Sequence, residues 1–119
     1  MKRGDLFWAE LKPRSGSEQR GRRPVVIVSN DGFNSVPNWR SVIVVPVTTS
    51  KRQAGRGPTT VPIITRASNL DEDSIAICHQ ITTLDRSKIQ GHIGALTEAS
   101  MRAIERGIAA ACDLGPYTQ

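Results

Sequence analysis

The chain has 119 residues, of which 38% are hydrophobic and 23% are charged, and its formal net charge is +5. This length suits one folded domain over residues 1–119, and the composition is that of a globular chain, which excludes a disordered one. No apolar run is long enough to span a bilayer, and the N-terminus lacks the apolar stretch of a signal peptide. We therefore expect a cytoplasmic protein.

Strands and loops alternate in the first half of the sequence. Apolar patterning, β-branched runs and Gly/Pro signals define the boundaries. The predicted segments are strand 4–11, loop 12–23, strand 24–30, loop 31–41 and strand 41–50. Trp8 is expected in the core. Pro46 lacks the backbone N–H that a ladder needs, so it predicts a bulge or a sheet edge.

The second half predicts shorter strands before the end of the chain. The expected segments are loop 51–60, strand 60–65, turn 67–73, strand 74–83, and one helical turn followed by a short strand within 84–94. Alternation along 74–83 places three isoleucines and His79 on one face of a single long strand.

A helix is predicted after Thr97, which is a favourable N-cap residue. Gly115 and Pro116 end it. Its apolar stripe at helical spacing is Met101, Ile104, Ile108, Ala111 and Cys112. Neither cysteine belongs to a CxxC motif, so both are expected to be reduced and buried. Five or six short strands and one helix predict a small, curved antiparallel sheet or partly open barrel.

Positive charge is concentrated in the N-terminal half. Residues 1–56 hold eleven Lys/Arg against four Asp/Glu, whereas residues 57–119 hold five against seven. Twelve of the sixteen cations are arginines, whose planar guanidinium matches phosphate. An anionic partner, RNA first, is the natural hypothesis. A basic face that only maintains solubility accounts for the charge count equally well.

Several chemistries can be compared from the residues alone. The acidic run 71–73 reads as a charged turn, because consecutive residues do not converge on one ion, and no metal or cofactor motif is present. His79 and His92 permit an acid–base pair, although a satisfied core or interface histidine is favoured for His79 and simple exposure for His92. No motif for a serine or cysteine nucleophile is present.

RNA cleavage by the substrate's own 2′-hydroxyl fits the residues better. Such a reaction needs alignment and stabilisation of extra phosphate charge, which arginines, hydroxyls and backbone amides supply. Arg23, held by Pro24 at the start of a core strand, is the best position for this contact. Thr48, at the end of a neighbouring strand, can add a hydrogen bond.

Four stretches in order, RGDLFWAEL, GSEQRGRRPVVIVSND, VPVTTS and CHQITTLD, closely resemble the MazF/PemK toxins of bacterial toxin–antitoxin systems. The resemblance implies an SH3-like barrel with a C-terminal helix, in the CcdB/PemK-like toxin fold, acting as a homodimer. It implies a metal-independent, sequence-specific endoribonuclease that cuts single-stranded RNA to 2′,3′-cyclic phosphate and 5′-hydroxyl ends. It also implies a cognate antitoxin whose acidic or hydrophobic tail covers the RNA groove.

The resemblance assigns roles to some residues, namely Ser17, Glu18, Gln19, Arg23, Thr48 and Gln80. The other candidates follow from the charge, aromatic character or position of the residues themselves. Arg23 and Thr48 match the catalytic arginine and threonine. Glu18 is a candidate base, and an ion pair with a nearby arginine is an equal alternative. The expected substrate-binding residues are Ser17, Gln19, Arg20, Arg22, Thr49, Lys51, Arg52 and Gln80. Phe33 and Trp39 are candidates for stacking on bases. His79 is a candidate for touching bases or for lying at the dimer interface.

The loop 51–57 either closes over RNA or stays disordered until a partner binds.

Two other readings remain. CcdB-like toxins share the barrel but bind DNA gyrase without catalysis, and they end in Trp-Ile, whereas this chain ends in GPYTQ. An inactive, purely RNA-binding relative is the third reading, which the joint presence of Arg23 and Thr48 disfavours.

Overall fold

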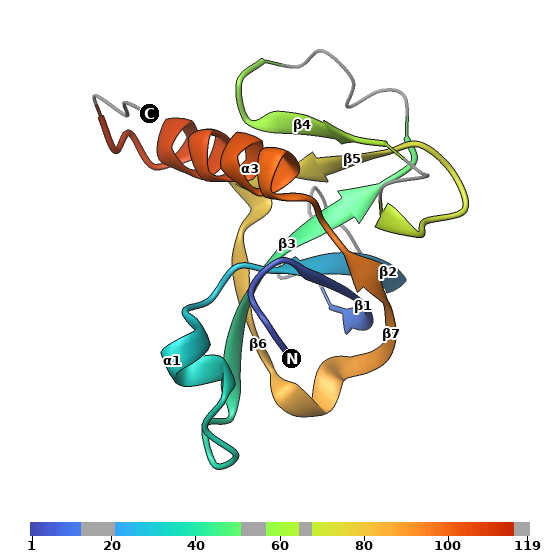
Figure 1. Ribbon diagram of the computed structural model, residues 1–119, viewed down its shortest axis with the longest axis vertical. Helices are drawn as coiled ribbons and strands as arrows, with labels where there is room; N and C mark the ends of the chain where they lie inside the picture. Colours follow the sequence, from blue (N-terminus) through green and yellow to red (C-terminus); the bar gives the residue numbers. More distant parts are fainter. Residues whose placement is uncertain (13–20, 51–56, 65–67, 116–119) are drawn as a thin grey trace.

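The fold is given by a computed structural model that describes residues 1–12, 21–50, 57–64 and 68–115. These residues form an antiparallel sheet of seven strands, followed by a C-terminal helix (Figure 1). The strands are β1 (Asp5–Leu11), β2 (Gly21–Ile27), β3 (Ser41–Thr48), β4 (Thr60–Ile63), β5 (Ser74–Ile77), β6 (Thr82–Asp85) and β7 (Ile89–Ala95). The helices are α1 (Asp31–Asn34) and α3 (Glu98–Ala111).

The central strand β3 changes partners along its length. The strand order is β4-β5-β3-β2-β1-β7, and β6 also pairs with β3. Residues 41–44 of β3 pair with β6, and residues 47–48 pair with β5. Pro46 lies between these two pairings, in a central strand rather than at the sheet edge. The sheet is not closed, which confirms the open form of the predicted mainly-β architecture.

Apolar side chains are buried on both faces of β2. Val26 packs in a cluster with Leu6 and the α3 residue Ile104, whereas Val25 and Ile27 pack in a second cluster on the other face. Because both faces are covered, β2 needs an unbroken β-branched run rather than alternation. The predicted core strand is therefore confirmed over residues 24–27, but it begins at Gly21 and ends at Ile27, so Arg22 and Arg23 lie in the strand rather than in the predicted loop.

The predicted C-terminal helix is present and begins as expected. The Thr97 hydroxyl accepts a hydrogen bond from the Ser100 N–H at 3.1 Å. Met101 and Ile104 are buried as predicted, but Cys112 is exposed. The expectation that both cysteines are buried was therefore wrong for Cys112, which lies past the last turn that packs on the sheet. Buried Gly107 contacts the sheet instead.

The long strand predicted over 74–83 is interrupted. β5 ends at Ile77, and residues Cys78–Gln80 form one 3-10 turn before β6. If the β5 register continued, Val44 would face His79, but it pairs with Thr82, three residues further on. The turn takes up these three residues, so His79 does not share a strand face with the isoleucines. Its side chain is exposed, and its Nδ1 lies 2.8 Å from the Thr59 hydroxyl.

The segment 31–41 was predicted to be a loop, and it contains the short helix α1, capped by the Asn30 side chain. Phe33 and Trp39 stack on each other with ring centroids 4.8 Å apart. Arg86 ties this segment down by donating hydrogen bonds to four backbone carbonyls, among them those of Phe33 and Trp39. Arg86 belongs to the predicted helical turn, which is observed at Arg86–Lys88 before β7. Among the described residues, no helix is long and apolar enough to cross a bilayer.

Candidate active site

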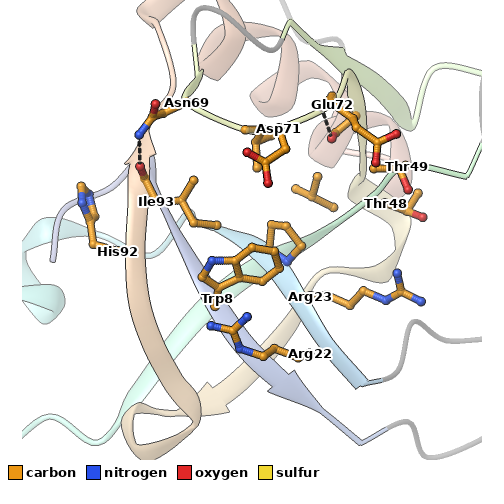
Figure 2. A pocket seen from close by; sticks show the side chains of 14 residues that line it. Trp8, Arg22, Arg23, Thr48, Thr49, Asn69, Asp71, Glu72, His92 and Ile93 are labelled. Atoms are coloured by element: carbon orange, nitrogen blue, oxygen red, sulfur yellow. Dashed lines mark hydrogen bonds between the residues drawn. The ribbon is translucent and has the colours of Figure 1, made fainter.

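A pocket of about 410 Å³ opens where β2 and β3 separate (Figure 2). Residues of β1, β2 and β7 form one side of it, and the end of β3 with the segment 69–74 forms the other. Its lining residues are Trp8, Arg22, Arg23, Pro24, Val47, Thr48, Thr49, Asn69, Leu70, Asp71, Glu72, Ser74, His92 and Ile93.

The pairing register of β2 and β3 explains why Arg23 and Thr48 line the same pocket. The two strands pair from Ile27↔Val44 to Val25↔Pro46. Two residues further, the same register places Arg23 across from Thr48. There β2 and β3 are no longer bonded, since their pairing ends at Val25↔Pro46, and β3 pairs through its other edge with β5. The space between them is the pocket, and each strand supplies one predicted catalytic side chain to it.

The Thr48 hydroxyl is held in a defined position. Only 4% of the residue is exposed, and its Oγ1 accepts a hydrogen bond from the Ser50 N–H at 3.1 Å. Because a hydroxyl both accepts and donates, its own O–H remains able to donate to an oxygen atom bound in the pocket. A donor held in place stabilises a negatively charged group better than a mobile donor does.

Arg22 and Arg23 are neighbours in sequence but point in different directions. Figure 2 shows Arg23 extending beneath Thr48 and Thr49, while Arg22 runs beneath Trp8. The Arg22 guanidinium lies 4.4 Å from the centroid of the Trp8 ring, a cation–π contact. Its Nε also donates to the Gln90 side chain at 2.8 Å. Alternation along β2 therefore gives the two arginines separate positions.

Trp8 lines the pocket, so the expectation that it belongs to the core was wrong. It pairs with Pro24 across β1 and β2, and its side chain is half-buried. The alternating pattern of β1 identified the strand but not what covers that face. The buried residues of the strand are Leu6, Ala9 and Leu11.

An acidic wall faces the arginines across the pocket. Asp71 and Glu72 line it, and Figure 2 shows the Asp71 carboxylate pointing into the pocket above Trp8. Asn69 anchors this segment by donating to the Ile93 carbonyl at 2.7 Å. The sequence showed these carboxylates only as part of a charged turn, because no local pattern signals that the turn folds back over β1 and β2.

Four of the predicted site residues line the pocket, namely Arg22, Arg23, Thr48 and Thr49. Gln80 does not, because it lies in the 3-10 turn after β5. Phe33 and Trp39 do not line it either, so their predicted stacking on bases has no support from the pocket. The predicted residues Ser17, Glu18, Gln19, Arg20, Lys51 and Arg52 lie outside the described residues.

The two histidines are separated. His92 lines the pocket and contacts Phe7 edge-on, with ring centroids 5.0 Å apart. His79 does not line it, so the pocket offers no support for paired acid–base histidines. Within the described ranges, no group of three or more His, Cys, Asp or Glu side chains is placed to hold a metal ion.

Comparison with known proteins gives consistent matches. Residues 2–112 match the family of PemK-like, MazF-like toxins of type II toxin–antitoxin systems. The chain is 35% identical over 108 residues to the endoribonuclease MazF of Staphylococcus saprophyticus, covering 91% of this chain and 88% of that protein.

Solved structures agree with this family match. The fold is similar to that of the Mycobacterium tuberculosis toxin MazF-mt6, with a TM-score of 0.76 and 24% identity over 94% of this chain and 99% of that one. It is also similar to a mycobacterial endoribonuclease solved in complex with its cognate antitoxin. That match has a TM-score of 0.75 and 27% identity over 98% of this chain and 97% of the other.

Proposed function

The chain belongs to the PemK-like, MazF-like toxin family of type II toxin–antitoxin systems, and we propose that the pocket is its RNA-cleaving site. The protein is an endoribonuclease toxin, in line with its relative from Staphylococcus saprophyticus. The finer proposal is that it cuts single-stranded RNA at a short sequence, without a metal ion, and leaves 2′,3′-cyclic phosphate and 5′-hydroxyl ends.

The observation that carries this proposal is the meeting of Arg23 and Thr48 at the point where β2 and β3 separate. Attack by the 2′-hydroxyl on the adjacent phosphorus adds negative charge to the phosphate oxygens and breaks the bond to the 5′-oxygen. Arg23 supplies a fixed positive charge for these oxygens, and the Thr48 O–H supplies a hydrogen bond. The nucleophile belongs to the substrate, so the protein needs no nucleophilic side chain.

Arg23 is not assigned as the base, because a guanidinium is protonated at any physiological pH. Its role is to stabilise charge and to donate hydrogen bonds, including to the departing 5′-oxygen, which becomes the 5′-hydroxyl by taking a proton from solvent. Glu18 remains our candidate for accepting the proton of the 2′-hydroxyl. This assignment rests on the family resemblance of the GSEQ segment alone.

Two protein partners complete the proposal. One is a second copy of the chain, forming a homodimer. The other is a cognate antitoxin that covers the pocket, consistent with the antitoxin complex of the mycobacterial relative. A pocket lined by Arg22 and Arg23 suits an acidic antitoxin segment for the same electrostatic reason that it suits RNA.

The direct test is cleavage of a long unstructured RNA in excess EDTA. Arg23→Ala is compared with Arg102→Ala, which removes an exposed arginine of α3 that does not line the pocket. We expect discrete fragments from the unchanged protein and from Arg102→Ala. Arg23→Ala should cut about 10²- to 10³-fold more slowly, the usual loss for one transition-state donor.

A modified substrate tests the chemistry separately. A 2′-deoxy sugar on the 5′ side of the cut removes the proposed nucleophile, so it should abolish cleavage at that bond only. The fragments should carry 5′-hydroxyl ends that accept phosphate from a kinase without prior phosphatase treatment. Absence of cleavage over many RNA sequences, by folded protein, would overturn the proposal, and binding to DNA gyrase would be tested next.

A further inference from the structure

We infer that Asp71 selects guanine at the nucleotide whose base enters this pocket, with Trp8 as the stacking surface. The inference rests on the proposed function, because it specifies which RNA the same pocket accepts. Base selection by this pair is assigned neither by the family match nor by the resemblance of individual motifs. It follows from how charge and aromatic surface are arranged around the pocket.

The pocket has two electrically different sides. Arg23 extends beneath Thr48 and Thr49, while the Asp71 carboxylate lies above Trp8, away from Arg23 (Figure 2). Phosphate groups are attracted to the first side and repelled by the second. The uncharged parts of a nucleotide are its ribose and its base, so a nucleotide bound with its phosphate at Arg23 can place its base on the carboxylate side.

Trp8 supplies a flat surface between these two sides. The Arg22 guanidinium covers the ring at 4.4 Å and is itself fixed by Gln90. In the view of Figure 2, the indole lies between Arg22 and Asp71. A base that stacks on the indole with an offset toward the segment 69–72 presents its edge to the Asp71 carboxylate, which lies above the ring in the same view. Stacking on an aromatic side chain tolerates any base, so discrimination must come from the edge.

Hydrogen bonds and close packing hold the backbone of the acidic wall in place. Asn69 ties it to β7 through the Ile93 carbonyl, and the Ser74 hydroxyl donates to the Glu72 carbonyl at 2.9 Å. The wall also packs tightly on β7, since a Cβ on Gly94 would lie 2.5 Å from the Ser68 carbonyl oxygen. The backbone of Asp71 is thereby held beside the pocket.

The chemistry of a carboxylate favours one base. An ionised carboxylate only accepts hydrogen bonds. Guanine offers two neighbouring donors on its Watson–Crick edge, N1–H and the N2 amino group, which match the two oxygens of Asp71. Uracil offers one N–H between two carbonyls, and adenine and cytosine each place a ring acceptor beside their amino group. Guanine is therefore the base that Asp71 binds without repulsion, and a bidentate pair of this kind discriminates by about 5- to 150-fold.

The test combines a protein change with a base change. Random-sequence RNA is cut by the unchanged protein, by Asp71→Asn and by Asp113→Asn, and the 5′-hydroxyl ends are sequenced. Asp113→Asn removes the same charge from an exposed position after α3, where the positive φ of 54° suits asparagine. We expect a guanine at one fixed position beside the cut for the unchanged protein and Asp113→Asn. Asp71→Asn should lose that preference about fivefold or more.

Inosine gives the sharper comparison, because it is guanine without the N2 amino group. Replacing that guanine by inosine should slow cleavage by the unchanged protein several-fold and leave Asp71→Asn unaffected. An identical base profile for the unchanged protein and Asp71→Asn, with RNA still cleaved, overturns the inference but not the proposed function. If no RNA is cleaved, the same comparison is made by binding of short 2′-O-methyl RNAs. If the unchanged protein binds two such RNAs equally, one with guanine and one with uracil at the tested position, the inference is overturned as well.

Discussion

Neighbouring arginines at the start of β2 show how position decides the use of a side chain. Arg22 is held by Trp8 and Gln90, whereas Arg23 faces the end of β3. Both carry the same charge, but a strand directs consecutive side chains to opposite faces. Arg22 therefore supports the aromatic surface of the pocket, and Arg23 is the arginine that we propose meets the phosphate.

The two cysteines lie in different environments, although the sequence suggested one environment for both. Burial raises the pKa of the Cys78 thiol to about 12, so it stays protonated at neutral pH. Cys112 is exposed. A thiolate, rather than a thiol, is the reactive species. The structure therefore predicts one accessible thiol and one inert thiol in the folded protein.

A thiol-specific reagent measures this difference. With DTNB at pH 8, the folded protein should release one equivalent of chromophore quickly and the second only after urea is added. Cys112→Ser should remove the fast phase, and Cys78→Ala should leave it unchanged. Two equally fast thiols in the folded protein would contradict the structure.

At the scale of the elements, the 3-10 turn Cys78–Gln80 forms the main packing contact between α3 and the sheet. The helix packs on this turn and on β4. Buried Gly107 gives the room, since a Cβ there would lie 2.6 Å from the Cys78 Sγ and 3.2 Å from the Val61 Cγ2. A close approach of two elements thus depends on one missing side chain.

Gly107→Ala should therefore destabilise the protein. In an open helix the change would stabilise by about 1 kcal/mol. Here the added methyl group overlaps the Cys78 side chain, and overpacking of this kind costs about 1–3 kcal/mol. Urea denaturation should show a lower free energy of unfolding for Gly107→Ala.

A double mutant gives the control for this prediction. Cys78→Ala removes the atom that the new methyl group meets, so adding it to Gly107→Ala should recover part of the lost free energy. Strictly additive losses for the two changes would mean that the contact between residues 78 and 107 is not the cause.

At the scale of the whole molecule, the charge asymmetry of the sequence becomes an asymmetry of the pocket. The basic N-terminal half supplies Arg22 and Arg23, and the acidic C-terminal half supplies Asp71 and Glu72. The surface around the pocket therefore carries both positive and negative charge. RNA binding at such a site should depend on salt through the few cations that meet phosphates.

This dependence is measurable with uncleavable 2′-O-methyl RNA. The logarithm of the binding constant should fall linearly with the logarithm of salt concentration, with a slope of about −0.7 per phosphate contact for a single strand. Arg23→Gln should reduce the magnitude of the slope by about 0.7, while Arg102→Gln on α3 should leave it unchanged. Equal slopes for all three proteins would argue against a phosphate at Arg23.

The sequence alone predicts most of the strands, the capped C-terminal helix and four of the residues that line the pocket, Arg22, Arg23, Thr48 and Thr49. These depend on local signals: β-branched runs, the Thr97 cap, and the family pattern around Arg23 and Thr48. Local signals are sufficient here because propensity, capping and motif spacing are properties of short segments.

The residues that line the pocket together with Arg23 come from distant segments of the chain, and only the folded structure shows them. The space opens where the pairing of β2 with β3 ends, and the fold-back of residues 69–74 brings Asp71 over Trp8. The break after Ile77 arises in the same way, from the two registers in which β5 and β6 pair with β3. These features depend on pairing between segments far apart in the chain, and such pairing leaves no periodic mark in the sequence of either segment.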